Sequence, residues 1–295
     1  EIRPWVKYGW EMILIVHEII KTENPIKNLN KEDLKILDCS WYLPNLGKSG
    51  NEEYLKERIP NSIYFDIDEF SDPNCPYPHT LLNDEKFSQK IGKLGIENSN
   101  HLIVYDAFGI FSSSRAWWMF KTYGHKNVSI LNGGLKKWKQ NNFPLEKGNP
   151  KSRVSTFYKS NLTKKNIINY DKVKKNISEN KFVLVDARPS GRFDGTSPEP
   201  RKEIKSGAIP NSVNIPYTDL VDQASGCYKK KDELKKIFSQ HKIDENTNVV
   251  FSCGSGVTAC LIGKAYEIVT GKEFKIFDGS WTEWAIREGH SLIHI

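Results

Sequence analysis

The chain has 295 residues, a length that favours two domains over one. Hydrophobic residues make up 38% and charged residues 27%, which excludes wholesale disorder, and no apolar run approaches the ~18 residues of a membrane-spanning helix. The net charge of +7 is spread over scattered Lys and Arg, which favours a solvated surface or an anionic small substrate over a nucleic-acid-binding face. The five cysteines include no C-x-x-C pair, so we expect free thiols in a reducing compartment and no metal site.

The sequence repeats itself at a spacing near 150 residues. The first copy carries, in chain order, Leu37-Asp38, Ile59-Pro60-Asn61-Ser62, Leu102–Tyr105, Asn132-Gly133-Gly134 and Trp138. Related markers return in the same order as Val185-Asp186, Ile209-Pro210-Asn211-Ser212, Val249–Phe251, Asp278-Gly279-Ser280 and Trp284. A spacing this long indicates two copies of one domain rather than a solenoid.

The repeat defines the expected domain organisation. Residues 1–20 match neither copy and carry no recognisable targeting signal, so we treat them as an unassigned N-terminal extension. The first domain is expected over 21–145 and the second over 166–295. Between them, residues 146–165 contain Gly148, Pro150 and many Lys and Ser, which is typical of a linker.

Short apolar runs alternate with helical stretches in each copy. The strands expected in the second copy are Phe182–Asp186, Val213–Ile215, Val249–Ser252 and Phe274–Phe277. Apolar residues at helical spacing predict a helix over Thr258–Val269. Strands separated by helices predict an α/β fold, in which each domain has a parallel sheet with helices on both faces. Ligands of such sheets bind at the carboxyl ends of the strands.

One such strand end carries a thiol. The expected strand Val249–Ser252 is followed by Cys253, then by Gly254-Ser255-Gly256, and then by a helix. Glycines and a helix start can present unpaired N–H groups, which would stabilise a thiolate or a charged sulfur adduct. The alternative is a buried cysteine beside a tight turn. Cys260, seven residues further on, is expected to be a packing residue on the following helix. A phosphatase loop is disfavoured, because Ala259 stands where the Cys-x5-Arg pattern requires arginine.

The loop Cys253–Ala259 resembles the active loop of 3-mercaptopyruvate sulfurtransferases, members of the rhodanese superfamily. The similarity runs from about Ile36 to Trp284. Its other motifs are Trp41–Pro44, Phe65–Asp68, Tyr77–His79, Asp186–Arg188, Gly191–Phe193, Pro198–Arg201, Gly207–Pro210 and Asp278–Trp281. The resemblance implies two tandem rhodanese-like domains. The first is expected to be non-catalytic, because Asp106 stands at the position of Cys253 and a carboxylate cannot carry a sulfane sulfur.

The resemblance also implies the reaction. Cys253 would attack the sulfur of 3-mercaptopyruvate, release pyruvate and retain a persulfide, which then passes to cyanide, a thiol or reduced thioredoxin. No cofactor and no metal is expected. The residues that the resemblance assigns to substrate binding within the loop are Gly254, Gly256, Val257 and Thr258.

Three arginines lie in the matching motifs of the second copy. Arg192 and Arg201 flank a proline-stiffened stretch, and the resemblance assigns them to the donor's carboxylate and carbonyl groups. Without the resemblance they would be two surface arginines in a polar loop. Arg188 matches a third arginine, which we place behind the site or between the domains, with a non-catalytic ion pair as the alternative.

The resemblance joins a histidine and an acid of the first copy to the loop serine. In that arrangement Asp68 fixes the tautomer of His79, and His79 activates the hydroxyl of Ser255 for proton transfer. Asp66 and Asp72 are nearby competitors for the acid role. The active site would therefore lie between the two domains.

Two other functions stay open. A sulfur-carrier rhodanese would hand its persulfide to a specific partner protein, as in tRNA thiolation or molybdenum-cofactor pathways. A thiosulfate sulfurtransferase is disfavoured, because the resembling enzymes that prefer thiosulfate carry cationic residues where Gly254 and Ser255 stand. We expect a small-molecule sulfur donor, a thiol or protein acceptor, no nucleic acid and no membrane. The expected location is the cytoplasm, with the mitochondrion as the alternative.

Overall fold

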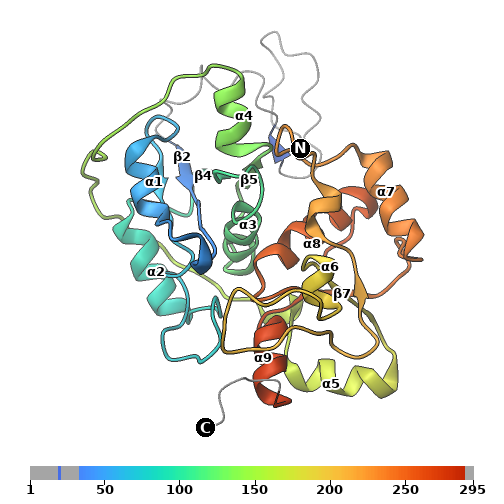
Figure 1. Ribbon diagram of the computed structural model, residues 1–295. Helices are drawn as coiled ribbons and strands as arrows, with labels where there is room; N and C mark the ends of the chain where they lie inside the picture. Colours follow the sequence, from blue (N-terminus) through green and yellow to red (C-terminus); the bar gives the residue numbers. More distant parts are fainter. Residues whose placement is uncertain (1–18, 21–32, 290–295) are drawn as a thin grey trace, which may run out of the picture.

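Two parallel sheets, each of five strands and flanked by helices, make up the computed structural model, which describes residues 19–20 and 33–289 (Figure 1). The strand order is β1-β5-β4-β2-β3 in the first sheet and β6-β10-β9-β7-β8 in the second. The two orders are the same once the second copy is renumbered, so the repeat in sequence is a repeat in topology. The predicted α/β fold with two tandem domains is confirmed.

The strands are short, as in most sheets whose two faces are both covered. They are β1 (Ile19–Ile20), β2 (Leu34–Asp38), β3 (Ile63–Tyr64), β4 (His101–Tyr105), β5 (Val128–Leu131), β6 (Ile167–Ile168), β7 (Val183–Asp186), β8 (Val213–Asn214), β9 (Val249–Ser252) and β10 (Lys275–Phe277). All these sheet pairings are parallel, and the interior strands β2, β4, β5, β7, β9 and β10 are built mainly from buried residues. The strand predicted over Val249–Ser252 therefore has the predicted bounds, and the other three differ by one residue at an end.

The helices connect successive strands. The α-helices are α1 (Gly50–Lys56), α2 (Asp84–Lys93), α3 (Ser113–Thr122), α4 (Gly134–Gln140), α5 (Tyr170–Glu179), α6 (Ser190–Phe193), α7 (Lys231–Gln240), α8 (Val257–Thr270) and α9 (Ser280–Arg287), with short 3-10 turns η2 (Pro44–Leu46), η3 (Lys164–Asn166) and η4 (Tyr217–Leu220). Helix α8 extends one residue beyond the predicted helix at each end. In the described part of the chain, none of these helices is long and apolar enough to cross a membrane.

The N-terminal boundary predicted at residue 21 falls after the first strand. Residues 1–18 and 21–32 lie outside the described residues, but Ile19–Ile20 pairs in parallel with β5 of the first sheet. Its counterpart in the second sheet is β6, which pairs with β10 in the same way. A two-residue strand has no periodicity from which the sequence could predict it.

The segment predicted as the linker, 146–165, crosses the surface of the first domain without a helix or strand before η3. It is held there by its backbone: Glu146 bridges Arg58, and the N–H of Thr156 donates to Gly92. The side chain of Tyr158 is buried. The linker is therefore a strap packed on the first domain rather than a free tether.

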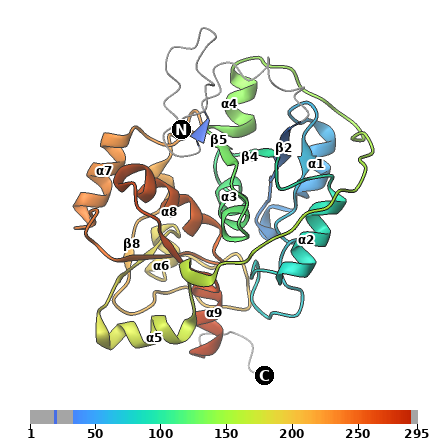
Figure 2. The same cartoon turned by 180° about the vertical axis from the view of Figure 1, so that it is seen from behind.

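Helices α3 and α8 bring the two domains together and lie side by side in both views (Figures 1 and 2). One continuous cluster of buried residues includes Trp117 of α3 and Leu261 of α8. The ring of Trp117 also lies 4.0 Å from the ammonium of the buried Lys264. The domain interface is thus apolar and close-packed, as in the interior of a single domain.

Each domain extends one arm over the other. The first arm, Ser71–Leu81, and the second arm, Val221–Tyr228, are each closed by an antiparallel bridge between their ends. The second arm reaches the first domain, where the side chain of Gln140 donates to the carbonyl of Ala224 and a Cβ at Gly109 would overlap Gly226. The first arm reaches the catalytic loop of the second domain through His79.

Candidate active site

Cys253 follows β9 directly and is only 2% exposed. Its N–H donates to the hydroxyl of Ser280 at 3.2 Å, and its carbonyl accepts from the N–H of Trp281 at 2.9 Å. Ser280 has a left-handed backbone, with φ of 52°, and donates its own hydroxyl to the carbonyl of Phe277 at the end of β10. The backbone of Cys253 is therefore held by the start of α9 at the carboxyl edge of the sheet, where the sequence predicted a ligand site.

The loop after Cys253 presents backbone donors. Over the described residues, the N–H groups of Gly254, Ser255 and Gly256 have no protein acceptor. Gly256 adopts φ of 79° immediately before α8, whose first turn adds further N–H groups and includes the buried Val257 and Thr258. This arrangement favours negative charge at the loop, as a thiolate or a persulfide requires.

The equivalent loop of the first domain shows the same donors in use. Asp106, which follows β4, accepts from the N–H groups of Phe108 and Gly109 on one carboxylate oxygen and from the N–H and hydroxyl of Ser113 on the other. These four bonds lie between 2.7 and 2.9 Å, and Asp106 is fully buried. The loop of this fold thus binds an anion, and in the first copy the anion is part of the chain.

A chain of three side chains leads from the catalytic loop to the first domain. The hydroxyl of Ser255 lies 2.8 Å from Nδ1 of His79, and Nε2 of His79 lies 2.8 Å from the carboxylate of Asp68. The indole N–H of Trp41 donates to the other oxygen of Asp68 at 2.8 Å, and its ring packs edge-on against His79 at 4.9 Å. The structure brings together the three residues that the resemblance had joined.

The contacts of His79 define its protonation. Because an ionised carboxylate accepts only, Nε2 must carry a proton toward Asp68, which leaves Nδ1 free to accept from Ser255. Burial lowers the pKa of His79, and the nearby Arg201 and Arg115 lower it further, against the opposing effect of Asp68. Partial burial raises the pKa of Asp68, but its contacts with His79, the hydrogen bond from Trp41 and the charge of Arg201 together outweigh that effect, and the net shift is downward. The neutral imidazole paired with a carboxylate is the arrangement of a general base.

The two competing carboxylates point elsewhere. Asp66 accepts from the N–H of Asp68, and Asp72 accepts from the backbone and side chain of Asn74. Neither contacts His79 within the described ranges. The geometry selects Asp68 as the partner of the imidazole.

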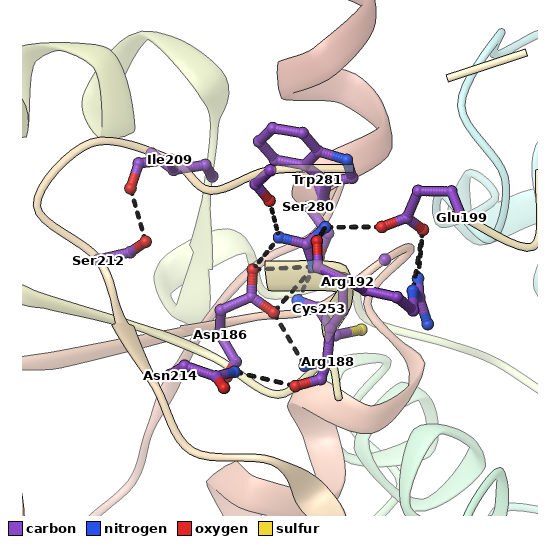
Figure 3. A network of polar contacts seen from close by, with 12 residues as sticks. Asp186, Arg188, Arg192, Glu199, Ile209, Ser212, Asn214, Cys253, Ser280 and Trp281 are labelled. Carbon is purple, nitrogen blue, oxygen red and sulfur yellow. Dashed lines mark hydrogen bonds and ion pairs between the residues drawn. The ribbon is translucent and has the colours of Figure 1, made fainter. Parts of the chain in front are cut away.

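A buried ion network holds Arg192 over the loop (Figure 3). Arg188 is fully buried and donates to Asp186 at 2.7 Å, to the carbonyl of Gly207 at 2.6 Å and to one oxygen of Glu199 at 2.7 Å. The other oxygen of Glu199 accepts from Nε and Nη2 of Arg192 at 3.0 and 2.5 Å. All of these contacts of Arg188 lie within the second domain. Arg188 therefore supports Arg192 through Glu199.

Two guanidinium groups face the thiol. A Cβ added to Gly254 would lie 2.8 Å from Nη2 of Arg192, which places that group beside the residue next to Cys253. Arg201 interacts electrostatically with Cys253, Arg192 and Asp68, and burial lowers its pKa. The strongest charge interaction of its guanidinium is with Glu203. An arginine of this kind, half-buried and facing a thiol, suits an anionic ligand.

The sequence did not predict a role for several residues that lie in the site. Trp41, Glu199 and Ser280 stand within motifs that the sequence pointed out, so the resemblance could have suggested them. Arg115 of α3 belongs to no such motif, yet it is fully buried against the catalytic loop. A single arginine in an apolar helix gives no sequence pattern that would indicate a place in the active site.

Cys260 lies one helical turn into α8 and is fully buried. Its thiol donates to the carbonyl of Gly256 at 3.1 Å, and burial raises its pKa to about 12. These contacts agree with a packing residue. No group of three or more His, Cys, Asp or Glu side chains suited to a metal ion occurs in the described part of the chain.

A family model for the rhodanese-like domain matches residues 24–141 and 169–287, one match for each sheet. The chain belongs to the rhodanese family. Each of the two sheets therefore belongs to one rhodanese domain that the family model matches in sequence. The predicted tandem arrangement is confirmed.

Named relatives of this rhodanese include human 3-mercaptopyruvate sulfurtransferase, 41% identical over 87% of this chain and 86% of the human protein. The mitochondrial thiosulfate/3-mercaptopyruvate sulfurtransferase 1 of Arabidopsis thaliana is 37% identical over 88% of this chain and 73% of its own. These relatives confirm the prediction that the rhodanese is an enzyme, a sulfurtransferase.

Solved structures agree with the fold. The 3-mercaptopyruvate sulfurtransferase SseA from Escherichia coli aligns with a TM-score of 0.81 and 32% identity, over 90% of this chain and 98% of that one. The sub-stoichiometric sulfur transferase subunit of yeast mitochondrial complex I aligns with a TM-score of 0.82 and 33% identity, over 92% and 97%.

Proposed function

We propose that the protein transfers sulfur from 3-mercaptopyruvate through a persulfide on Cys253 to a thiol, cyanide or protein acceptor, and releases pyruvate. The observation that carries the proposal is the position of Cys253. A buried thiol lies in a loop whose N–H groups have no acceptor among the described residues, beside Arg192 and within the electrostatic influence of Arg201. Relatives named for this activity support the choice of donor.

The first half-reaction follows from these groups. The Cys253 thiolate attacks the donor sulfur, and an S–S bond forms as the C–S bond breaks. The electron pair of the broken bond goes to carbon as the enolate of pyruvate, which must gain a proton. The donor's own S–H supplies that proton: Ser255 gives its hydroxyl proton to the enolate carbon and regains one from the donor S–H, while His79, kept neutral by burial and held by Asp68, accepts from Ser255 as this proton moves. The persulfide that remains is stabilised by the loop N–H groups.

Arg192 and Arg201 bind the other end of the donor. The carboxylate of 3-mercaptopyruvate suits a bidentate guanidinium, and both arginines lie on the thiol side of the second domain. Arg192 reaches this position already held by Glu199, so little of its side-chain entropy remains to be lost on binding.

Thiosulfate is the second candidate donor. Its dianion also suits Arg201, and the Arabidopsis relative is named for both donors. Against it, Gly254 and Ser255 supply no positive charge beside the thiol. We therefore propose 3-mercaptopyruvate as the preferred donor.

The acceptor of the sulfur and the location of the protein in the cell are also proposals. We propose a thiol such as reduced thioredoxin as the acceptor of the Cys253 persulfide, and a complex-associated yeast relative supports a protein acceptor as the alternative. A relative named as mitochondrial supports the mitochondrion as one location besides the predicted cytoplasm. Cell fractionation against marker proteins, together with recovery of mixed disulfides from a Cys253 persulfide, decides these points.

The test is a comparison of kcat/KM for 3-mercaptopyruvate and thiosulfate in the wild type and three variants. Cys253→Ser should abolish turnover of both donors and prevent the gain of about 32 Da that one sulfur atom adds. Arg201→Leu should lower kcat/KM for 3-mercaptopyruvate about 30- to 1000-fold, mostly through KM. Arg153→Leu, in the linker and hydrogen-bonded to the carbonyl of Asn61, is the control and should leave both constants unchanged. A sulfur adduct on another cysteine contradicts the assignment.

A further inference from the structure

Arg115 of α3 connects the two halves of the active site. It belongs to the first domain, is completely buried, and packs its guanidinium over the ring of Trp118 at 4.6 Å. A buried guanidinium is costly unless its donors are satisfied, so the positions of its partners indicate what it holds in place.

Its partners lie on both sides of the domain interface. Nη2 donates to the carbonyl of His79 in the first arm and lies 2.8 Å from the carboxylate of Asp278, which follows β10 of the second domain. Nη1 donates to the carbonyl of Gly256 at 3.4 Å, and a Cβ on Gly256 would approach Nη1 to 2.9 Å. One planar group thus contacts three chain segments.

Two of these segments have left-handed backbones. His79 has φ of 64° and Gly256 has φ of 79°. For a histidine this conformation is strained and persists only where the surroundings hold it. Ser255 directly precedes Gly256, so the guanidinium is anchored to the backbone on both sides of the His79 to Ser255 hydrogen bond.

We propose that Arg115 is a positioning residue for sulfur transfer, which fixes His79 of the first domain at hydrogen-bond distance from Ser255 of the second. The proposal rests on the proton-transfer role proposed above for His79. Arg115 itself acts only through the backbone of these residues. Its loss should lower kcat by releasing His79 and should leave donor binding at Arg192 and Arg201 intact.

The charge of Arg115 provides a second readout. The groups that face His79 are Asp68 and Trp41 of the first domain, Ser255 and Arg201 of the second, and Arg115 itself. Arg115 and Arg201 lower the pKa of the imidazole, and Asp68 raises it. Removing the positive charge of Arg115 should therefore raise the pKa of His79. On the acidic limb of the profile of kcat against pH, His79 becomes protonated, and this limb should then move to higher pH.

The experiment compares Arg115→Met and Arg115→Lys with the control Arg58→Met. Arg58 is also completely buried, with 0% exposure, and pairs with Glu146 at 2.5 Å, but its contacts lie within the first domain and its strap. Its loss should lower the melting temperature and leave kcat and the acidic limb unchanged within about twofold. Arg115→Met should lower kcat about 30-fold or more, within the range typical of general acid–base groups, and shift the acidic limb upward. Arg115→Lys keeps the positive charge but lacks the forked guanidinium that holds both backbones, so it should lower kcat without shifting the acidic limb of the pH profile.

A double-mutant cycle with His79→Ala separates this proposal from the proposed function. If Arg115 acts through His79, then Arg115→Met or Arg115→Lys should change kcat by less than about twofold in the His79→Ala background. The same loss in both backgrounds, or a loss no larger than that of Arg58→Met, overturns the proposal. If His79→Ala alone leaves kcat unchanged, the proton-transfer role itself is wrong, and the inference fails with it. If Arg115→Met does not fold, the cycle with Arg115→Lys decides.

Discussion

Gly254→Ala tests whether Arg192 binds the donor beside the thiol. The added Cβ would lie 2.8 Å from Nη2 of Arg192, whereas ordinary contacts begin near 3.4 Å, so the guanidinium must withdraw by about 0.6 Å. The same Nη2 atom is 2.5 Å from Glu199, and this withdrawal would strain that bond and displace the group from the donor. Loss of one charge-assisted hydrogen bond costs about 1.5–3 kcal/mol. We expect kcat/KM for 3-mercaptopyruvate to fall about 10- to 150-fold.

The assay is steady-state release of pyruvate by Gly254→Ala, Arg192→Leu and the double variant. Because the alanine acts by moving Arg192, its effect should shrink to less than about twofold when Arg192 is already leucine. A full loss in both backgrounds would show that the methyl group blocks the thiol directly. An unchanged kcat/KM in Gly254→Ala would refute the placement of Arg192 beside the donor.

Three further predictions concern single side chains. Cys260→Ser should keep kcat within about twofold and still allow the sulfur adduct on Cys253, because a serine hydroxyl can keep the bond to the carbonyl of Gly256 and the contact with Arg115. Mass spectrometry of the donor-treated protein can check this. Asp68→Asn should lower kcat about 100-fold or more, because the asparagine amide can donate to Nε2 of His79 and force the imidazole proton onto Nδ1. With a proton on Nδ1, His79 can no longer accept from Ser255. The pH profile of kcat tests this. Asp38→Asn should raise the free energy of unfolding above pH 6 by up to about 3 kcal/mol, because burial raises the pKa of Asp38 from 3.8 to about 6. Ionisation of this buried carboxyl destabilises the folded wild type as pH rises through that range. The gain should vanish near pH 3.5, which thermal melts can test.

The sequence predicts local features of this site better than distant ones. Cys253 could be found because a buried strand, a thiol, two glycines and a helix follow one another within a few residues. The repeat likewise identified Asp106 as the residue that replaces the thiol, although its four hydrogen bonds could not be foreseen. The pairing of His79 with Ser255 joins residues 176 positions apart, and no periodicity encodes it. That pairing came from the family resemblance alone.

The remaining gaps have physical causes as well. The sequence left open whether Arg188 lay behind the site or in an unimportant ion pair, because only the fold shows that Glu199 binds it and Arg192 together. Strand β1 was missed because two residues have no pattern. Arg115 was missed because a buried arginine reads as a surface residue in a sequence, where its partners are unknown.

The two arms have a consequence for the origin of the protein. Each domain extends its arm over the loop of the other, and the first arm, with 11 residues against 8 in the second, is the one that carries a histidine. Two separate copies of such a domain would exchange arms across a twofold axis and form a homodimer with two equivalent sites. In a single chain the two copies need not keep equal sites: the first carries Asp106 in place of a thiol and still places His79 against the loop of the second. The first domain therefore takes part in the site of the second although its own loop carries no thiol.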